Sequence, residues 1–294
     1  MASYFLQIGL NSLVEAMQIV LLAGAFLMIH NVSKVVNLGL GAAFTIGAYS
    51  VYAGLQTGGT LEAFLIFVCS LLLFTWINVK ALEPFIQKNL DLMGLLASVS
   101  IWFGVQELHV LIFGAQGRSL IEGVLPTVHF AGLTLPWTGV WTLILCFCLA
   151  LLSFFVLLYT PLGRSIRALK QHAPATAQLG IKEKRIRYGV FAFSIFLAGI
   201  VGVFTGMNEA MTPMASHTLI IPAFLAFLVG GGKDVRGVFL AGLILILVPS
   251  LAISLSFFGT SISEAWKPVL VFALALILLV LRPNGLLTIR TRTS

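Results

Sequence analysis

Charged residues are scarce in this sequence of 294 residues, in which they make up 9% against 59% hydrophobic residues. Soluble globular domains have about a quarter charged residues, so the composition excludes an ordinary soluble protein. We therefore predict a polytopic membrane protein. Acidic residues are the rarer charge, and the net charge is +7. We interpret this excess as topology and lipid contact, with no nucleic acid as a partner.

Cysteine is also rare. Cys69, Cys146 and Cys148 all lie in apolar segments, and an odd, membrane-embedded set argues against disulfides and against a metal site. No Lys or Arg precedes Lys34, so the positive region of a cleavable signal peptide is missing. We therefore expect the first apolar segment to remain in the mature chain.

No group of residues suggests catalysis. The glycines at 230–232 are followed by Lys-Asp and not by the Gly-Lys-Ser or Gly-Lys-Thr of a phosphate-binding loop. His109 follows Glu107 by two positions, which puts the two on different sides of a helix and makes them a poor metal pair. We predict that the chain is not an enzyme and binds no cofactor or metal of its own.

Long apolar segments dominate the rest of the sequence. Since about 20 apolar residues cross the hydrocarbon core, we predict an all-α, polytopic helical membrane protein with about eight long transmembrane helices. A further apolar piece, 219–229, contains Pro222 and is predicted to form a short or broken helix that either crosses or re-enters. Residues 1–294 are treated as a single transmembrane domain. The long spans are predicted at 8–29, 36–55, 61–80, 92–113, 138–159, 188–208, 237–257 and 266–281.

Small residues recur four positions apart in two of these spans. Side chains of this size let helix backbones approach closely in lipid. We therefore predict a compact bundle and not a scaffold around a wide, water-filled pore. The two sets are Gly39, Ala43 and Gly47 in the second span, and Ala198, Gly202 and Gly206 in the sixth.

One long polar segment, 161–187, interrupts the apolar sequence, and Glu183 is its single acid. Positive charge concentrates on the cytoplasmic side of membrane proteins, so we place this segment there. Counting the spans in both directions from this segment places 114–137 and the N-terminus outside. It places the C-terminus inside if 219–229 crosses the membrane. The basic residues of the segment are Arg164, Arg167, Lys170, Lys182, Lys184, Arg185 and Arg187.

Within this segment, Ala173 to Gly180 is predicted to form a short helix. Pro174 suits a first helical position, and Gly180 suits the left-handed residue after the last turn. A helix this short is marginal in water, so the rest of the chain or a partner must hold it. The alternative is a solvated basic loop.

Two runs in this segment carry a family resemblance: Leu-Gly-Arg-Ser-Ile-Arg-Ala at 162–168, and Ala-Pro-Ala-Thr-Ala-Gln-Leu-Gly-Ile at 173–181. They resemble the cytoplasmic loop of permease subunits of branched-chain amino acid ABC importers, with its Gly-Arg-x-x-Arg-Ala run, Pro-x-x-Ala helix and Leu-Gly-Ile exit. Ala173 stands where this family usually has Asn or Asp, which removes a side-chain cap worth about 1 kcal/mol.

Three further runs extend the resemblance over nearly the whole chain. Residues 35–49 are similar to a Val-x-Asn-Phe-Ala-His-Gly run that ends in Leu-Gly-Ala-Tyr, although Leu40 replaces the common His. Residues 228–232, with Gly237, are similar to Leu-Gly-Gly-x-Gly and the following Gly-Ala. Residues 281–286 match a closing Arg-Pro-x-Gly-Leu.

The resemblance implies a permease subunit in the cell (inner) membrane of a bacterium or archaeon. It also implies a second permease, identical or homologous, two cytoplasmic ATPase subunits that bind ATP and Mg²⁺, and an external solute-binding protein. The loop of the family docks into a cleft on the ATPase, so 173–179 would be the coupling helix. The residues implied in this coupling are Arg164, Arg167, Ala173, Pro174, Ala175, Ala177, Leu179 and Gly180.

Polar residues at membrane depth are the candidates for the translocation path. A charged group at mid-bilayer costs at least about 2.5 kcal/mol, so Glu15 and Glu107 should face the bundle or a water path. Glu15 precedes Gln18 by three positions, on one helical face. Interhelical pairing is the alternative to a path role for the acids. The candidates are Glu15, Gln18, Asn37, Gln106, Glu107 and Asn208.

A secondary transporter or channel, with a broken helix at 219–229, is the alternative function. A third possibility is a structural membrane anchor. Such a protein would need no polar residues in its spans, so the acids at membrane depth count against it. The solute stays open, since branched-chain amino acids, urea, short amides and other small polar solutes all fit the family. The sequence also leaves open whether the two permeases are identical.

Overall fold

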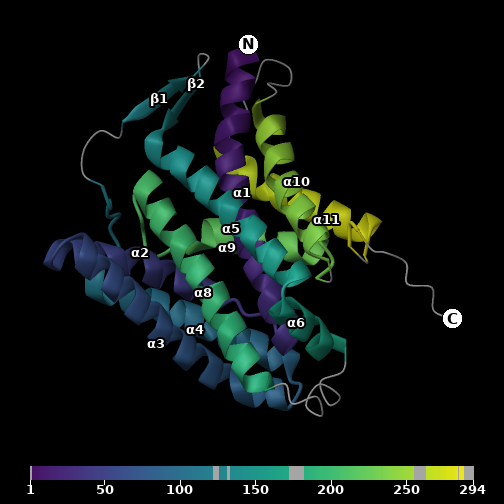
Figure 1. The fold of residues 1–294 in the computed structure, drawn as a ribbon. Helices are drawn as coiled ribbons and strands as arrows, with labels where there is room; N and C mark the ends of the chain where they lie inside the picture. The colour runs from purple at the N-terminus through teal and green to yellow at the C-terminus, as the bar shows by residue number, and fades with distance from the viewer. Residues whose placement is uncertain are drawn as a thin grey trace. The chain divides into compact units, whose positions relative to one another are not determined.

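The computed structural model describes residues 2–121, 126–130, 133–171, 182–232, 234–254, 263–283 and 285–287. Helices dominate these residues, and their β-structure is a small two-stranded hairpin (Figure 1). The predicted class, an all-α polytopic membrane protein, is confirmed. The helices are α1 (Ala2–Ser33), α2 (Leu40–Thr57), α3 (Thr60–Gln87), α4 (Asp91–Phe113), α5 (Trp137–Tyr159), α6 (Pro161–Gln171), α8 (Glu183–Asn208), α9 (Ser216–Val229), α10 (Val235–Ser254), the 3₁₀ turn η2 (Glu264–Trp266) and α11 (Lys267–Leu281).

Seven of the described helices are long and apolar enough to cross a membrane, and they correspond to seven of the eight predicted spans. The remaining span, predicted at 36–55, is α2, which has 18 residues and begins at Leu40. Because it has many Gly, Ser and Thr residues, its 18 residues are less apolar than the most apolar 18-residue stretch of each of the other seven. The short helix α9 has 14 residues, begins at Ser216 and runs through Pro222 without a break. That α9 crosses the membrane stays a prediction.

The chain packs as two compact units, each assembled from separate stretches of sequence. The first unit comprises residues 1–27, 125–150 and 221–294, and the second comprises residues 28–124 and 151–220. The prediction of a single permease domain is not tested by this division.

The core of the second unit is α2, packed against α3, α4 and α8. A Cβ atom added at Gly47 would lie 2.4 Å from the carbonyl oxygen of Gly199, and one at Gly202 would lie 2.1 Å from that of Phe44. Only glycine fits such contacts, so the backbones of α2 and α8 touch. The close approach predicted from the small residues is confirmed at Gly47 and Gly202.

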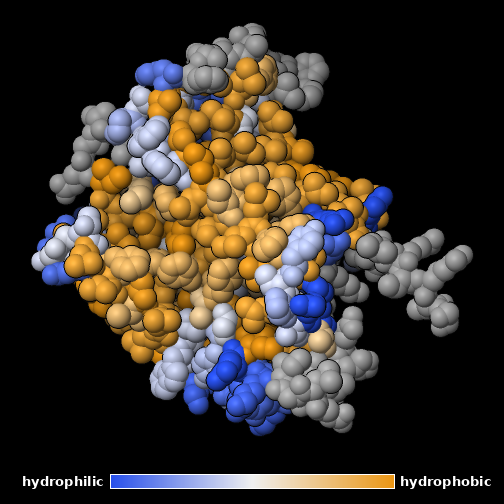
Figure 2. Space-filling model, viewed as in Figure 1, coloured by the Kyte–Doolittle hydropathy of each residue, from blue (hydrophilic) through white to orange (hydrophobic). Residues whose placement is uncertain are grey.

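The first unit contains the hairpin, which the sequence analysis assigned only to an outside segment. Its strands are β1 (Thr127–Phe130) and β2 (Leu133–Pro136), antiparallel, with Val128 opposite Leu135. In the same unit, α1 packs on α10 where Gly242 meets Val20, and α10 packs on α11. Most of the span Glu264–Leu281, which contains α11, is exposed: 11% of its residues are buried. Apolar side chains cover most of the face shown in Figure 2, as expected for a surface in lipid.

Candidate functional site

The basic segment begins with α6, an amphipathic helix in the second unit. Ile166 and Leu169 are buried, whereas Arg164 and Arg167 are exposed. The guanidinium of Arg167 donates hydrogen bonds to the carbonyl oxygens of Leu157 and Leu158, near the end of α5. Carbonyl groups at a helix C-terminus lack partners within the helix and attract cations. Arg167 therefore fixes the angle at which α6 leaves α5.

The predicted coupling helix lies outside the described residues, and so do six of the residues assigned to it: Ala173, Pro174, Ala175, Ala177, Leu179 and Gly180. The structure does describe both ends of the segment that contains it. Arg164 and Arg167 lie on one continuous helix, α6. Their role in coupling stays a prediction.

The basic segment ends at the first turn of α8, where two ion pairs form. Glu183 accepts a hydrogen bond from Arg187 one turn later, and Arg187 is 6% exposed. Lys184 lies 3.1 Å from the carboxylate of Glu83 in α3. The first pair stabilises the beginning of α8 and the second joins α8 to α3.

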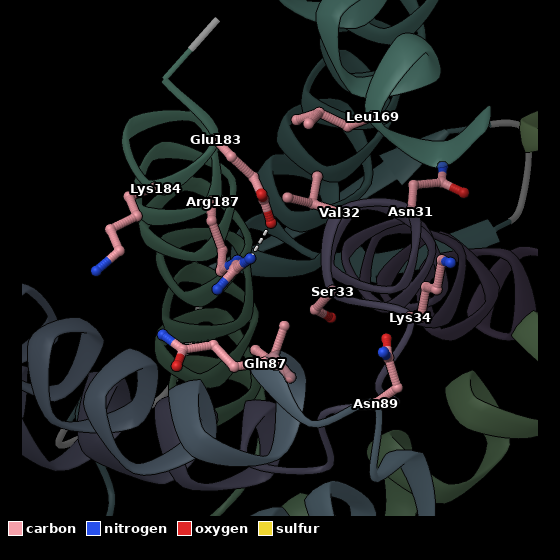
Figure 3. A pocket seen from close by; sticks show the side chains of 11 residues that line it. Asn31, Val32, Ser33, Lys34, Gln87, Asn89, Leu169, Glu183, Lys184 and Arg187 are labelled. Atoms are coloured by element: carbon pink, nitrogen blue, oxygen red, sulfur yellow. Dashed lines mark hydrogen bonds and ion pairs between the residues drawn. The ribbon is translucent and has the colours of Figure 1, made fainter. Parts of the chain in front are cut away.

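A cavity of about 340 Å³ lies beside these ion pairs (Figure 3). Its wall comes from the ends of α1 and α3, from Leu169 of α6 and from the start of α8. Lys34 and Asn89 follow α1 and α3 with φ of 60° and 52°, the left-handed conformation that ends many helices. Both line the cavity. Two helix ends and both ends of the basic segment thus meet within the second unit.

One face of α4 carries a line of side chains that bind the rest of the second unit. Its buried residues are Gly94, Ser98, Trp102 and Gln106, spaced four apart. The hydroxyl of Ser98 accepts a hydrogen bond from the backbone N–H of Leu38, 3.0 Å away. A Cβ at Gly41 of α2 would lie 2.2 Å from the ring of Trp102, so the indole lies directly on α2.

The C-terminal half of this face of α4 contacts the start of α9. The indole N–H of Trp102 donates to the hydroxyl of Ser216 at 3.0 Å, and the ring stacks on His217 at 4.5 Å between centroids. Nε2 of His217 lies 2.7 Å from Oε1 of Gln106. Gln106 was predicted as a path residue. It is 2% exposed, and its side-chain carbonyl oxygen contacts His217 and not the outside of the protein.

The same face of α4 continues into an aromatic group. Tyr49 of α2 contacts the rings of His109 and Phe113 at 5.2 and 4.9 Å. Arg118 donates to the hydroxyl of Tyr52 at 3.1 Å, and its backbone pairs with that of Met211. These contacts anchor the segment that follows α4 to α2.

The other path candidates of the second unit lie apart from this face. Asn37 is 1% exposed, donates to the side chain of Asn78 at 2.8 Å and accepts from the N–H of Gly39 at 3.0 Å. These bonds hold the entry to α2. Glu107 is exposed on α4, and Asn208 is half-buried at the end of α8. The structure does not bring the three together.

The remaining two candidates, Glu15 and Gln18, belong to the first unit. The carboxylate of Glu15 forms an ion pair with the ammonium group of Lys267, the first residue of α11. Gln18 is 6% exposed. The interhelical pairing considered for Glu15 is therefore present, whereas the path role is untested.

Trp102, His217 and Lys267 are among the residues of these networks that were not singled out from the sequence. The repeat of Gly94, Ser98, Trp102 and Gln106 at four-residue spacing could have identified the face of α4. The described residues contain no group of His, Cys, Asp and Glu that could hold a metal ion.

Comparison with known families decides how these features are interpreted. The family described as "Branched-chain amino acid transport system / permease component" matches residues 8–281. The chain belongs to this family. The resemblance found in the sequence is thereby confirmed, and the chain is a multi-pass membrane component of a transport system.

Relatives of this member of the permease family match along most of its length. The "High-affinity branched-chain amino acid transport system permease protein LivH" of Escherichia coli (strain K12) is 25% identical over 97% of the permease and 96% of its own chain. The "Probable branched-chain amino acid transport permease protein LivH" of Methanocaldococcus jannaschii is 25% identical over 79% and 76%.

A solved structure, "PsaBC from Streptococcus pneumoniae in complex with Fab", is also similar to the permease. The TM-score is 0.50 with 16% sequence identity, and the match covers 95% of the permease and 92% of that chain. At this identity the likeness shows the fold alone.

In the permease, two of the glycine motifs that resemble the family meet each other. Gly285, with φ of 95°, lies so close that an added Cβ would be 2.5 Å from Cα of Gly231. The N–H of Leu286 donates to the carbonyl of Val229 at 3.2 Å. Both glycines have positive φ, which side chains rarely allow. The motif after α11 therefore closes the turn after α9 within the first unit.

Proposed function

We propose that the chain is the transmembrane permease subunit of an ATP-binding cassette importer that moves a small polar solute such as a branched-chain amino acid. Family membership and the branched-chain amino acid transport function of the LivH relatives support this proposal. The chain would pair with a second permease, identical or homologous, and receive solute from an external binding protein. Two separate ATPase subunits would bind ATP and Mg²⁺ and supply the work.

We place the permease in the inner membrane of a bacterium or archaeon, with the basic segment 161–187 in the cytoplasm. The distribution of Lys and Arg supports this orientation. Residues 173–179 would dock on the ATPase as a coupling helix. The N-terminus would then lie outside and the C-terminus inside.

One observation supports this coupling role most directly: both ends of the basic segment are tied into the second unit. Arg167 bonds to the carbonyl groups near the end of α5, and Lys184 pairs with Glu83 of α3. A partner that moves the segment between these anchors moves the helices that carry them. A solvated loop without function would not need either contact.

The contacts of the second unit suggest how such a movement travels inward. From the start of α8 it reaches α2 at the backbone contacts of Gly202 with Phe44 and of Gly47 with Gly199. From α2 it reaches α4, because Trp102 lies on Gly41. Close-packed backbones move together since neither can yield to the other. The inward-open and outward-open states would then differ in these contacts, as alternating access requires.

The substitution Ala177→Trp tests the coupling role. A bulky ring on the proposed docking surface should prevent docking, whereas the spans are stabilised in lipid. We expect a correctly inserted permease that no longer retains its ATPase and no longer stimulates ATP hydrolysis with loaded binding protein. Copurification and ATPase assays measure both effects.

The matched control is Leu162→Trp, which adds the same ring to a residue of α6 that is 60% exposed. It should retain the ATPase. Normal ATPase affinity and normal transport in Ala177→Trp would contradict a coupling role for 173–179 and favour the turn at 231–236 instead.

A further inference from the structure

A line of polar side chains runs along the first half of α1, in an otherwise apolar helix. Gln7, Asn11, Glu15 and Gln18 are spaced by four, four and three positions. At about 100° per residue they fall within a sector of roughly 80°, and at 1.5 Å per residue they cover about 16 Å of the helix. Polar residues at this depth are expensive in lipid, so a continuous line of them indicates a surface that meets water or polar groups.

The outermost member of this line, Gln7, is hydrogen-bonded to the hairpin. The side-chain amide of Gln7 donates to the carbonyl of Thr134 at 2.6 Å and accepts from its N–H at 2.8 Å. It also donates to Asn11 at 3.1 Å. Gln7 is half-buried, and exposure then falls from Asn11, which is exposed, through Glu15 to Gln18, which is buried. The line therefore leads from an accessible end of α1 into its buried part.

The charged member of the line has an accessible partner. Glu15 and Lys267 form an ion pair within the first unit, and their side chains are 32% and 25% exposed. A carboxylate has two oxygens and an ammonium group has three donors, so this single contact leaves each charge able to bind another group. A partly exposed pair is stable beside water or a polar ligand but costly against lipid tails.

We propose that this face of α1 lines the solute path and that the Glu15–Lys267 pair recognises a zwitterion. The ammonium group of an amino acid would bind Glu15, and its carboxylate would bind Lys267. In an α-amino acid these two charges are separated by a single carbon, so one molecule fits a pair of side chains already in contact. The inference rests on the proposed function and selects amino acids over urea and amides, which carry no such charges.

The exchange also explains why a charge pair suits a path. When the solute binds, each side chain replaces one opposite charge with another, so no charge is left unpaired at membrane depth. When the solute leaves, the pair closes again. A neutral solute could not separate the two side chains without leaving both uncompensated.

The test uses three variants of the full complex in proteoliposomes: Glu15→Gln, Lys267→Met and the double variant. Loss of one hydrogen bond to a charged group should lower leucine uptake at limiting substrate about tenfold in each single variant. The double variant should stay as low. A purely structural pair predicts instead that the double variant recovers, since no buried charge is left alone, and recovery would overturn the proposal.

A control and a second readout separate this result from loss of the transporter. Glu264→Gln removes a nearby exposed acid outside the pair and should transport normally. All variants should retain the ATPase and its stimulation by loaded binding protein. If the unaltered permease fails to retain an ATPase, the proposed function fails, whatever the variants do.

A labelling experiment tests the site without removing either charge. In a variant that lacks Cys69, Cys146 and Cys148, a cysteine in place of Asn11 should react with a membrane-impermeant thiol reagent. Leucine should slow this reaction, whereas leucinamide and 4-methylpentanoate, each lacking one charge, should not. The control Leu6→Cys, at a 61% exposed position on another face, should be unaffected by all three. Equal protection of Asn11→Cys by the three compounds would overturn zwitterion recognition.

Discussion

Helices α2 and α11 are both apolar, yet they are used in opposite ways. Most residues of α2 are buried, and its glycines bring it into backbone contact with α8. In α11 only Val271 and Ala275 are buried, and large side chains such as Phe272 and Leu276 are at least half exposed. The less hydrophobic helix is therefore the one in the protein core.

This contrast follows from the solvent. Lipid tails are as apolar as leucine, so burying a large side chain in the protein gains little, and helix association depends on close packing. Small residues permit that packing, whereas large aliphatic residues are stable facing lipid. Of these two helices, the one with the higher hydropathy is the exposed one, and the one rich in small residues is the one packed against other helices.

The largest effect should come from the core side of this comparison, in Trp102→Ala. The substitution removes the ring that lies on α2, its bond to Ser216 and its stacking on His217. We expect destabilisation of about 4 kcal/mol, the range of large-to-small core substitutions. Thermal unfolding of the purified permease measures it. Trp76→Ala, at a 56% exposed position, should change the midpoint little. Equal shifts of the midpoint in the two variants would contradict the claim that the packing around α2 determines stability.

A smaller loss is expected for Gly202→Ala in α8. The added methyl would lie 2.1 Å from the carbonyl oxygen of Phe44, so α2 and α8 must separate. Overpacking of this kind costs about 2 kcal/mol. Gly189→Ala is the matched control on the same helix, because a Cβ there meets nothing within 4 Å. It should be neutral or slightly stabilising, since alanine favours helices by up to about 1 kcal/mol. An unchanged stability of the Gly202→Ala protein would show that α2 and α8 can move apart at this contact without loss.

The smallest effect is expected on α11. Leu276 is 64% exposed, so Leu276→Ala should shift stability by less than about 0.5 kcal/mol, as surface substitutions do. The same unfolding assay applies, with Ala275→Leu as the counterpart, because Ala275 is 1% exposed and should not accept a larger side chain. A large loss of stability in Leu276→Ala would instead mean that a second chain covers this face of α11.

The positions of the long helices could be predicted because hydropathy is a property of each segment alone. Their pairing could not. Nothing in the residues around Trp102 indicates its partner, because Ser216 is 114 residues away. Lys267 gave no signal either, since a lysine at the end of a span ordinarily faces the interface.

The candidate site could be predicted in part for similar reasons. Gln106 and Glu15 were identified because polar residues are conspicuous in apolar spans. Asn37 was identified by the same argument, but its bonds to Asn78 and Gly39 serve the local backbone. Composition marks a polar group at depth without showing whether its partner is the protein or a solute. The hairpin at 127–136 was missed because two four-residue strands give little periodic signal.

The low hydropathy of α2 has a consequence for biogenesis. A helix enters the bilayer as it is synthesised according to its own apolar content, and α2 lacks an 18-residue stretch as apolar as those of the seven long spans. Only Gly58 and Gly59 separate it from α3, which is 28 residues long and strongly apolar. We therefore expect α2 to insert only after α3 has been synthesised, when the two helices can enter the membrane together as a helical hairpin.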